Sequence, residues 1–441
     1  MDIRHKGVRK TDSRDMIQNS IDYIEDHLKA DIDAAELASR AGFSVFHFYR
    51  LFQAAVGYPI MQYILRRRLL HTVYAMRCGS KGIDAALEYG FETYAGFYKA
   101  FLREFGCTPQ EFLKSRRAKR PIKPNLSLEA VMTVTHKKAA GILRHWNLEN
   151  EPITDIYYDG TGEKNAHALY IGEQYVLKFT EDREKLESNI RLACALDAAG
   201  LCAALPIPTE EGKPYYTDGE IHFCLTRRLP GRQAVTSDFY AEEGGSAARF
   251  IGGIIGQLHK TLIKLELPVF EADLLEAFRH ALPKAQSILR TDGTFCAELS
   301  SRFESQYKKL PRQIIHRDPN PGNIISDGNT WGFIDFELSE RNVRIFDPCY
   351  AATAILSENF SDTDSEQNET WLTVYRNIFA GYEDAVGLTE EEREAAPYVL
   401  LANQMICVAW FSEQEKYREQ FEANRKMTLW LIEKFEELKL R

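Results

Sequence analysis

The feature that most restricts what this 441-residue chain can fold into is a string of polar residues set among apolar ones, at residues 313 to 348. It reads QIIHRDPNPGNIISDGNTWGFIDFELSERNVRIFDP and contains H-R-D-x-x-x-x-N, followed by Asp335 twelve residues after Asn323. Phosphoryl transfer needs a carboxylate that accepts the proton of the attacking hydroxyl, and an amide and a second carboxylate that hold Mg²⁺ against the nucleotide phosphates. The pattern therefore indicates Asp318 as the base, with Asn323 and Asp335 as metal ligands.

Two further parts of a nucleotide site precede this string in the expected order. Lys178 stands at the end of the apolar run YVLKF, where a kinase lysine meets the α- and β-phosphates of ATP or GTP. Gly160 and Gly162 lie in DGTGEKNA and offer a flexible cover for the phosphates, although two glycines are equally typical of a hairpin turn.

The helix expected after the lysine strand should supply a carboxylate partner for Lys178. Glu184 and Glu187 are the candidates, and Glu187 is assigned to the nucleotide site. Asn189 occupies the position that alignment with a kinase favours, so the pairing stays open.

Charge differs in sign between the two parts of the chain. Residues 1 to 123 carry a net charge of +7 and residues 124 to 441 a net charge of −16. The basic part suits a polyanion such as double-stranded DNA, although a solvated helical surface would have the same balance. The acidic part favours a cationic acceptor such as an amine, and acidic solubility explains it equally well.

The composition argues against a membrane-spanning protein and against a secreted one. No apolar run approaches the roughly 20 residues that span a bilayer, and the first residues contain no apolar signal segment. Eight cysteines lie far apart without a C-x-x-C pair, so we expect free thiols. The sequence predicts a cytoplasmic protein without a membrane partner.

Periodicity and punctuation predict three segments. Residues 13–118 have a helical pattern almost throughout, and a basic, proline-containing stretch begins the predicted linker at 119–150. Residues 151–441 begin with strand-like runs and continue, after about residue 246, as mainly helical sequence interrupted by the string at 313 to 348. Strands followed by helices indicate an α+β arrangement.

The helical segment contains an internal repeat. AGFSVFHFYRLFQAAVGYP at residues 41 to 59 aligns with YGFETYAGFYKAFLREFGCTP at residues 89 to 109. Each copy has an apolar helix, a glycine-containing turn and a second helix whose Phe residues recur at i and i+4. This layout is typical of two helix-turn-helix motifs, which would place two reading helices about one DNA turn, roughly 34 Å, apart. The alternative is a plain helical bundle.

Residues 13 to 118 resemble the DNA-binding domain of the AraC/XylS family of transcription regulators. The resemblance rests on the paired GF turns, the FYRLF and FYKAF cores, the endings with Gly and Pro, and the central helix MQYILRRRLLHTVYAM. It implies that the second helix of each motif exposes base-reading residues: Ser44, Val45, His47, Arg50, Thr93, Tyr94, Tyr98 and Lys99. A further group of arginines is expected to contact phosphates: Arg66, Arg67, Arg68, Arg116 and Arg117.

Residues from about 150 to 441 resemble the superfamily of aminoglycoside phosphotransferases and choline kinases. The matching marks are YVLKF, IGGIIGQLHK at residues 251 to 260, IIHRDPNPGN and GFIDFE. Glu337 follows Phe336 where a protein kinase has Gly, and no A-P-E string follows, which favours a small-molecule kinase. Arg317 stands where this superfamily more often has Gly, so the acceptor side of the pocket is expected to differ.

Together these features predict a multidomain protein, an all-α tandem helix-turn-helix domain followed by an α+β bilobal protein-kinase-like fold. One hypothesis is a transcription regulator that carries an active kinase for a hydroxylated small molecule, for which the acidic balance favours a cationic acceptor, with Mg²⁺ and ATP or GTP as cofactors. The other is a regulator whose kinase-like domain senses a ligand with little or no turnover.

Overall fold

The computed structural model describes residues 13–56, 59–105, 107–114, 121, 123–124, 134–157, 164–241, 244–413 and 418–440. The chain divides into two compact units, Met1–Gly172 and Glu173–Arg441.

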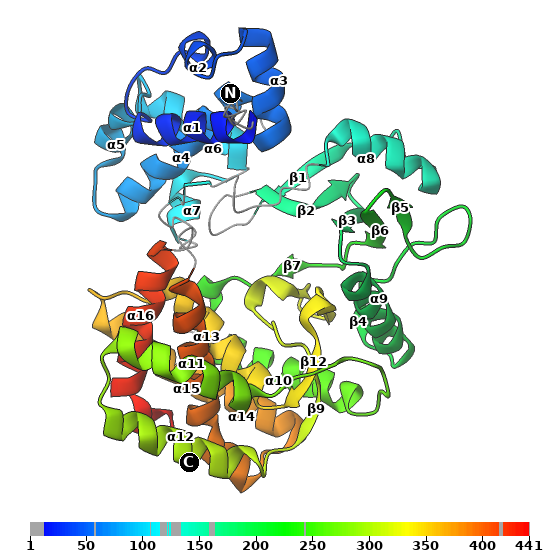
Figure 1. The fold of residues 1–441 in the computed structure, drawn as a ribbon, viewed down its shortest axis with the longest axis vertical. Coiled ribbons are helices and arrows are strands. Elements are labelled where there is room, and N and C mark those ends of the chain that lie inside the picture. Colours follow the sequence, from blue (N-terminus) through cyan, green and yellow to red (C-terminus); the bar gives the residue numbers. More distant parts are fainter. Residues whose placement is uncertain are drawn as a thin grey trace, which may run out of the picture. The chain divides into compact units, whose positions relative to one another are not determined.

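Short α-helices fill the first part of the first unit, drawn in blue and cyan in Figure 1. They are α1 (Ser13–Asp26), α2 (Ala34–Arg40), α3 (Val45–Val56), α4 (Ile60–Arg77), α5 (Gly82–Glu88), α6 (Tyr94–Phe105) and α7 (Pro109–Lys114). The internal repeat is confirmed, because α2 and α3 correspond to α5 and α6. The turn glycine of each copy, Gly42 and Gly90, has a positive φ (74° and 81°), a conformation that glycine adopts at little cost.

Each helix-turn-helix copy has its own apolar core. Phe48 and Phe52 are fully buried in the first core, and Phe97 and Phe101 are fully buried in the second, as the i, i+4 spacing predicts. Helix α4 contributes to both, with Ile60, Tyr63 and Ile64 in the first core and Leu69, Leu70 and Val73 in the second. The central helix therefore joins the two motifs by burying a different stretch of its length in each.

The first unit ends with a helix and a hairpin. These elements are α8 (His136–Leu143), the short 3₁₀ helix η1 (Arg144–Trp146), β1 (Ile153–Tyr157) and β2 (Lys164–Ile171). Strands β1 and β2 pair in an antiparallel manner. Helix α8 lies inside the segment that the sequence assigns to a linker, and Thr135 caps its N-terminus by accepting a hydrogen bond from the Lys138 N–H.

The second unit contains strands at intervals along the chain. They are β3 (Tyr175–Thr180), β4 (Cys202–Ala203), β5 (Tyr216–Asp218), β6 (Ile221–Arg227), β7 (Arg232–Gln233), β8 (Phe270–Glu271), β9 (Arg312–Ile315), β10 (Ile324–Ser326), β11 (Trp331–Phe333) and β12 (Glu340–Val343). Strands β3 and β5 both pair with β6. Two small sheets are ordered β4-β11-β10-β7 and β8-β12-β9. Residues 316 to 339 lie along the chain between β9 and β12 and contain β10 and β11.

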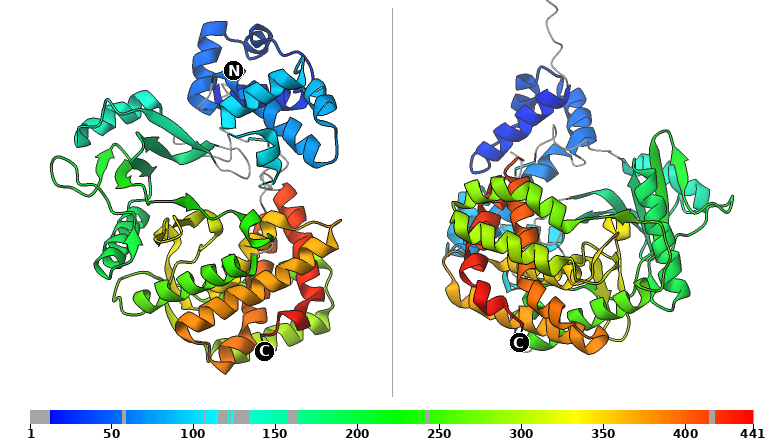
Figure 2. Two further views of the ribbon diagram at one scale, coloured as in Figure 1. Left: turned by 180° about the vertical axis from the view of Figure 1, so that it is seen from behind. Right: turned by 60° about the horizontal axis from the view of Figure 1, so that its bottom comes forward.

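Helices form the rest of the second unit. They are α9 (Arg183–Ala198), α10 (Gly244–Leu262), α11 (Leu274–Leu289), α12 (Gly293–Tyr307), α13 (Phe346–Asn359), α14 (Ser365–Val386), α15 (Glu390–Phe411) and α16 (Arg418–Glu433), with short 3₁₀ helices η2 (Thr236–Phe239), η3 (Pro321–Asn323), η4 (Phe336–Leu338) and η6 (Phe435–Leu438). Figure 2 shows most of the α-helices that follow β7 gathered into one bundle. The fold is the expected helical module followed by a mixed α/β, kinase-like domain.

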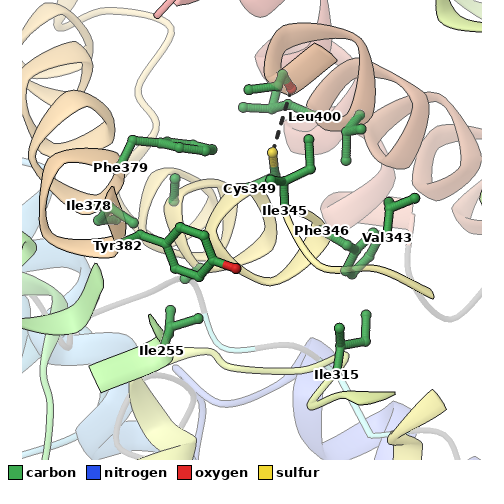
Figure 3. Packing of buried hydrophobic residues seen from close by; sticks show 14 of the residues in the cluster. Ile255, Ile315, Val343, Ile345, Phe346, Cys349, Ile378, Phe379, Tyr382 and Leu400 are labelled. Carbon is green, nitrogen blue, oxygen red and sulfur yellow. Dashed lines mark hydrogen bonds between the residues drawn. The ribbon is translucent and has the colours of Figure 1, made fainter. Parts of the chain in front are cut away.

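The core of this bundle reaches the polar string. Ile255, Tyr382 and Leu400, from three helices, belong to the same packed core as Ile315 and Phe346, which flank the string's candidate site residues (Figure 3). In the same core the Cys349 thiol donates a hydrogen bond to the carbonyl oxygen of Ala396 (3.5 Å). The loop that carries Asp318 thus lies on a packed apolar base.

Glycines bring α10 and α14 into close contact. A Cβ atom at Gly252 would overlap the carbonyl oxygen of Ile378, and one at Gly381 would overlap the carbonyl oxygen of Arg249. At the neighbouring Gly253, the nearest atom to such a Cβ would be the Gly381 carbonyl oxygen at 3.8 Å, an ordinary contact.

We therefore expect Gly252→Ala to lower the free energy of unfolding by about 1 to 3 kcal/mol, because the backbones must separate to admit the methyl group. Gly253→Ala is the matched control, and it should be neutral or stabilising by up to about 1 kcal/mol through helix propensity. Urea unfolding of the full chain measures both. Equal effects of the two substitutions would contradict this account of the packing.

Candidate functional site

Asp318 and Asn323 lie in direct contact in the loop between β9 and β10. The Asn323 amide nitrogen donates to the Asp318 main-chain oxygen (3.0 Å) and to its carboxylate (3.1 Å). The Asn320 amide nitrogen donates to the other carboxylate oxygen of Asp318 (2.8 Å). These bonds fix the carboxylate and determine which atom of each amide faces it.

Lys178 and Asp335 form a second pair. The Lys178 Nζ lies 3.2 Å from Asp335 Oδ1, and both side chains are partly exposed. The Ile334 N–H donates to the main-chain oxygen of Asn323 (3.0 Å), so the segments that carry Asn323 and Asp335 are adjacent. The structure thus brings together the four residues predicted from the string and from the YVLKF strand.

Backbone conformation is unusual at two places in this site. Arg317 and Asp335 have φ values of 76° and 71°, in the left-handed region that costs a residue other than glycine on the order of 1 to 3 kcal/mol. The Phe336 N–H next to Asp335 donates to the Asn189 side-chain oxygen (3.0 Å). Asn189 therefore contacts the Asp335 segment instead of Lys178.

The acidic residues of α9 are not directed to Lys178. Glu187 accepts hydrogen bonds from Arg183 and from the Tyr215 hydroxyl, each at 2.8 Å, and these bonds, with Arg183 first, lower its pKa. Glu184 is exposed. The structure thus does not bring Glu187 together with Lys178. Gly160 and Gly162 lie outside the described residues.

A buried network of hydrogen bonds supports the loop that carries Asp318. The Asp347 carboxylate accepts hydrogen bonds from the main-chain N–H groups of His316 (2.8 Å) and Arg317 (2.9 Å), and it bonds to His259 Nε2 (2.9 Å). His259 Nδ1 lies 2.8 Å from the Tyr382 hydroxyl. Burial lowers the pKa of the enclosed His316 imidazole. Sequence reasoning quoted the strings that hold His259 and Asp347 but gave neither residue a role.

The first of the two predicted reading helices, α3, presents its predicted residues to solvent. Val45, His47 and Arg50 are exposed, and the exposed Ser44 caps the helix through its hydroxyl, which accepts from the His47 N–H (3.4 Å). Phe46, which sequence reasoning omitted, has 76% of its surface exposed. An aromatic ring that is so open at the start of a reading helix suits apolar contact with base edges.

The second reading helix, α6, is exposed in part. Thr93 and Lys99 are exposed, whereas Tyr94 and Tyr98 are half-buried. The Thr93 hydroxyl caps the helix by accepting from the Gly96 N–H (3.0 Å). Thr93 thus has the same structural role as Ser44 in the first copy.

The prediction of phosphate contacts is wrong for Arg66 and Arg67. Arg66 and Arg67 are each 4% exposed. Arg66 pairs with Glu104 (2.6 Å), and Arg67 pairs with Glu25 (2.7 Å). Arg68 is half-buried and donates to the main-chain oxygens of residues 28 and 30. These side chains hold the helices of the module together, while Arg116 and Arg117 lie outside the described residues.

Glu25 makes the stability of this module depend on pH. Burial by itself raises its pKa, but the nearby His71 imidazole and the hydrogen bonds from Arg67 and Tyr63 outweigh burial and lower the pKa to about 2. A lowered folded-state pKa gives stability that is present above about pH 4.5 and is lost as the pH falls toward 2.

We therefore expect the helix-turn-helix module to lose roughly 3 kcal/mol between pH 5 and pH 2 through this one group. Hydrogen-exchange protection of α1 and α4 in the full chain measures this loss. Glu25→Gln should be less stable near neutral pH and should flatten the dependence. An unchanged slope in that variant would assign the acid sensitivity to other carboxylates.

Within the described part of the chain, no helix is both long and apolar enough to cross a lipid bilayer.

Comparison with known proteins identifies relatives of both parts. A helix-turn-helix domain model matches residues 37–115, and a model of the phosphotransferase enzyme family matches residues 159–388. The right origin-binding protein of Escherichia coli (strain K12) is 28% identical over 157 residues, which cover 34% of this chain and 54% of that protein. The regulatory protein SoxS of Salmonella typhimurium is 29% identical over 98 residues, covering 22% of this chain and 92% of that protein.

Solved structures similar to this chain include a microcompartment-associated aminopropanol kinase, with 16% identity, a TM-score of 0.49, and coverage of 69% of this chain and 99% of that chain. Another is a choline/ethanolamine kinase family protein from Mesorhizobium loti, with 16% identity, a TM-score of 0.48, and coverage of 68% and 97%. The chain spans about half the length of the first curated relatives that it matches. With more than half of its length matched by one family model, the chain belongs to the phosphotransferase enzyme family and carries an AraC-type helix-turn-helix domain ahead of the phosphotransferase region.

Proposed function

We propose that this protein is a DNA-binding transcription regulator of AraC type whose second domain transfers a phosphoryl group from ATP or GTP to a hydroxyl group of a small molecule. The observation that carries the proposal is the meeting of two pairs, Asp318 with Asn323 and Lys178 with Asp335, on adjacent segments. Their residue types match the roles that phosphoryl transfer requires.

Each residue of these pairs has a separate task in the proposed reaction. Asp318 accepts the proton of the acceptor hydroxyl, and its carboxylate is already oriented by two amide donors. The Lys178 ammonium group neutralises phosphate charge, and its contact with Asp335 supports this role because Asp335 is the proposed metal ligand. Asp335 lies two residues after the end of β11 in a left-handed backbone conformation, and its carboxylate faces Lys178.

The side chains that are present fit Mg²⁺. The Asn323 amide nitrogen is committed to Asp318, so its oxygen is the atom available to a hard cation, and Asp335 supplies a carboxylate. The described residues include no group of three or more His, Cys, Asp or Glu side chains that would hold a metal by themselves. A magnesium ion at Asn323 and Asp335 would draw its other ligands from phosphates and water, and it would neutralise the phosphate charge.

Turnover of nucleotide by the full chain tests this proposal. ATP and GTP are each supplied with a panel of amino alcohols, aminoglycosides and neutral sugars, since the acidic balance of residues 124 to 441 favours a cationic acceptor. The expected result is release of nucleoside diphosphate that depends on Mg²⁺ and on one class of acceptor. Nucleotide binding without turnover by any acceptor would contradict the kinase activity.

One observation favours the alternative, a ligand-sensing domain of low activity. Lys178 is paired with Asp335, whereas Glu187 of α9 is bonded to Arg183 and Tyr215. A kinase needs its lysine on the phosphates, and a helix carboxylate commonly holds it there. A sensor would bind nucleotide or acceptor and alter DNA affinity at a negligible rate of turnover.

Coupling between ligand and DNA is expected under either hypothesis. Residues of the predicted linker are fixed on α1, because Lys123 Nζ lies 3.0 Å from Asp22 and the Gln18 amide donates to the Pro124 oxygen (3.1 Å). We expect Mg²⁺-nucleotide with acceptor to change operator affinity by about 5- to 150-fold, and operator DNA must change ligand affinity by the same factor.

Fluorescence anisotropy at fixed salt measures operator affinity with and without ligand, and ligand affinity with and without operator DNA. Asp22→Asn removes a charge from the linker contact and should alter the coupling factor while leaving each separate affinity nearly unchanged. Equal operator affinity with and without ligand would show two independent functions on one chain.

A further inference from the structure

Arg317 stands in a backbone conformation that normally selects glycine, beside the proposed base. Its φ is 76°, and its N–H is fixed by the Asp347 carboxylate (2.9 Å). The side chain is also anchored, because its Nε lies 3.0 Å from Glu340, which is largely buried at the start of β12. An arginine held at both its backbone and its guanidinium keeps a strained loop conformation that glycine alone would leave free to change.

The guanidinium of Arg317 is linked to Asp318 through two aromatic rings. It lies over the Phe346 ring, 4.1 Å from the ring centre. Phe346 and Tyr350, one turn apart on α13, stack with centres 5.9 Å apart and an interplanar angle of 23°. Burial, followed by the charge of the Asp318 carboxylate, raises the pKa of Tyr350, so the Tyr350 ring lies close to the proposed base. Arg317, Phe346 and Tyr350 are called the aromatic clamp below.

We propose that the aromatic clamp fixes the Asp318 carboxylate, and that Arg317 is therefore a positioning residue for phosphoryl transfer. The inference rests on the proposed function, in which Asp318 is the base. It differs from the expectation that Arg317 alters the acceptor pocket, because the guanidinium is engaged by Glu340 and Phe346.

Two features support a positioning role. The contacts form a closed circuit, since Arg317 and Asp318 are neighbours in sequence and are also joined through Phe346 and Tyr350. The raised pKa of Tyr350 keeps its hydroxyl protonated, so the clamp places no second negative charge near the Asp318 carboxylate. Loss of any member should loosen the orientation of the carboxylate without removing it.

The test uses the full chain with Arg317→Gly, Arg317→Lys and Tyr350→Phe. Glycine accepts the positive φ but has no side chain, lysine keeps the charge without the planar stack, and phenylalanine keeps the ring stack without the hydroxyl group. Arg341→Ala is the matched control, because it removes the ion pair of a partly exposed arginine on the same strand as Glu340. Hydrogen exchange of the main-chain amides of residues 316 and 317 is measured with nucleotide turnover.

We expect Arg317→Gly to lower kcat by about 10- to 100-fold with little change in KM, and to speed exchange of these two amides by about tenfold. Tyr350→Phe should lower kcat with unchanged exchange, Arg317→Lys should recover part of the loss, and Arg341→Ala should change nothing. Unchanged exchange in Arg317→Gly would overturn the inference, as would a raised acceptor KM at constant kcat, which would mean direct contact with substrate. If the wild-type chain shows no turnover, the proposed function fails, and the exchange result alone decides whether the clamp holds the loop.

Discussion

Asp318→Asn is expected to lower kcat by about 10²- to 10⁴-fold, the usual contribution of a general base, while leaving the affinity for Mg²⁺-nucleotide nearly unchanged. The substitution keeps the size of the side chain, and the single asparagine oxygen still accepts one of the two hydrogen bonds that now reach the carboxylate from Asn320 and Asn323. What disappears is the ability to take a proton from the acceptor hydroxyl. The effect should therefore be confined to the chemical step.

Asp335→Asn separates this role from that of a metal ligand. It removes the same charge, but from the residue that now pairs with Lys178, so we expect weaker Mg²⁺-nucleotide binding as well as lower kcat. Glu298→Gln, at an exposed position on α12, is the control for the loss of one negative charge. Nucleotide titration and steady-state turnover distinguish the three variants. Full turnover in Asp318→Asn would remove it as the base.

The parts of the fold that local pattern encodes were predictable from sequence. The repeat predicted both helix-turn-helix copies because its Phe spacing and turn glycines are local requirements, and the structure buries Phe48 and Phe97 at equivalent positions. The H-R-D-x-x-x-x-N spacing likewise fixed the contact between Asp318 and Asn323, which are five residues apart. Both depend on neighbours in the chain, so no knowledge of tertiary structure was needed.

Contacts between distant segments were not predictable in this way. The run of arginines at residues 66 to 68 looks like a basic surface, but successive helical residues point about 100° apart, and α4 is buried in two cores. Two of the three arginines therefore face carboxylates that are buried or largely buried. His259 and Asp347 are 88 residues apart and meet only after the bundle forms.

The choice among the α9 side chains failed for a related reason. Glu187 and Asn189 are two residues apart and so lie on different faces of one helix. Which of these faces lies against residues 313 to 348 depends on how α9 packs. In the structure Asn189 contacts Phe336, and Glu187 contacts Tyr215. Sequence spacing alone gave the helix and its candidates but not their direction.

DNA affinity of the full chain is expected to fall steeply with salt. Each phosphate contact contributes about 0.9 to the slope of log K against log salt, so a protein with 6 to 10 contacts loses about 10³- to 10⁵-fold in affinity between 50 and 200 mM salt. Because Arg66 and Arg67 are buried, these contacts must come from other basic groups of residues 1 to 123, whose net charge is +7.

Substitutions of Arg50 separate its contribution to base recognition from its contribution through charge. It is exposed on α3, and Arg50→Lys keeps the charge but loses the two-donor fork that recognises guanine. We expect Arg50→Lys to keep the salt slope of the wild type while losing about 1 to 3 kcal/mol of discrimination at one base pair. Arg50→Ala should lose the discrimination too and, if the residue also neutralises phosphate, reduce the slope by about one contact.

Selection of operators from a random duplex library, followed by anisotropy titrations at several salt concentrations, gives both quantities. Arg67→Met is the informative contrast, because it leaves the buried Glu25 carboxylate without its arginine partner. It should weaken DNA binding only by lowering the fraction of molecules whose helix-turn-helix module is folded. Its affinity per folded molecule should match the wild type, whereas that of Arg50→Ala should not. A folded full-length chain that binds no duplex at low salt would contradict the DNA-binding role of both reading helices.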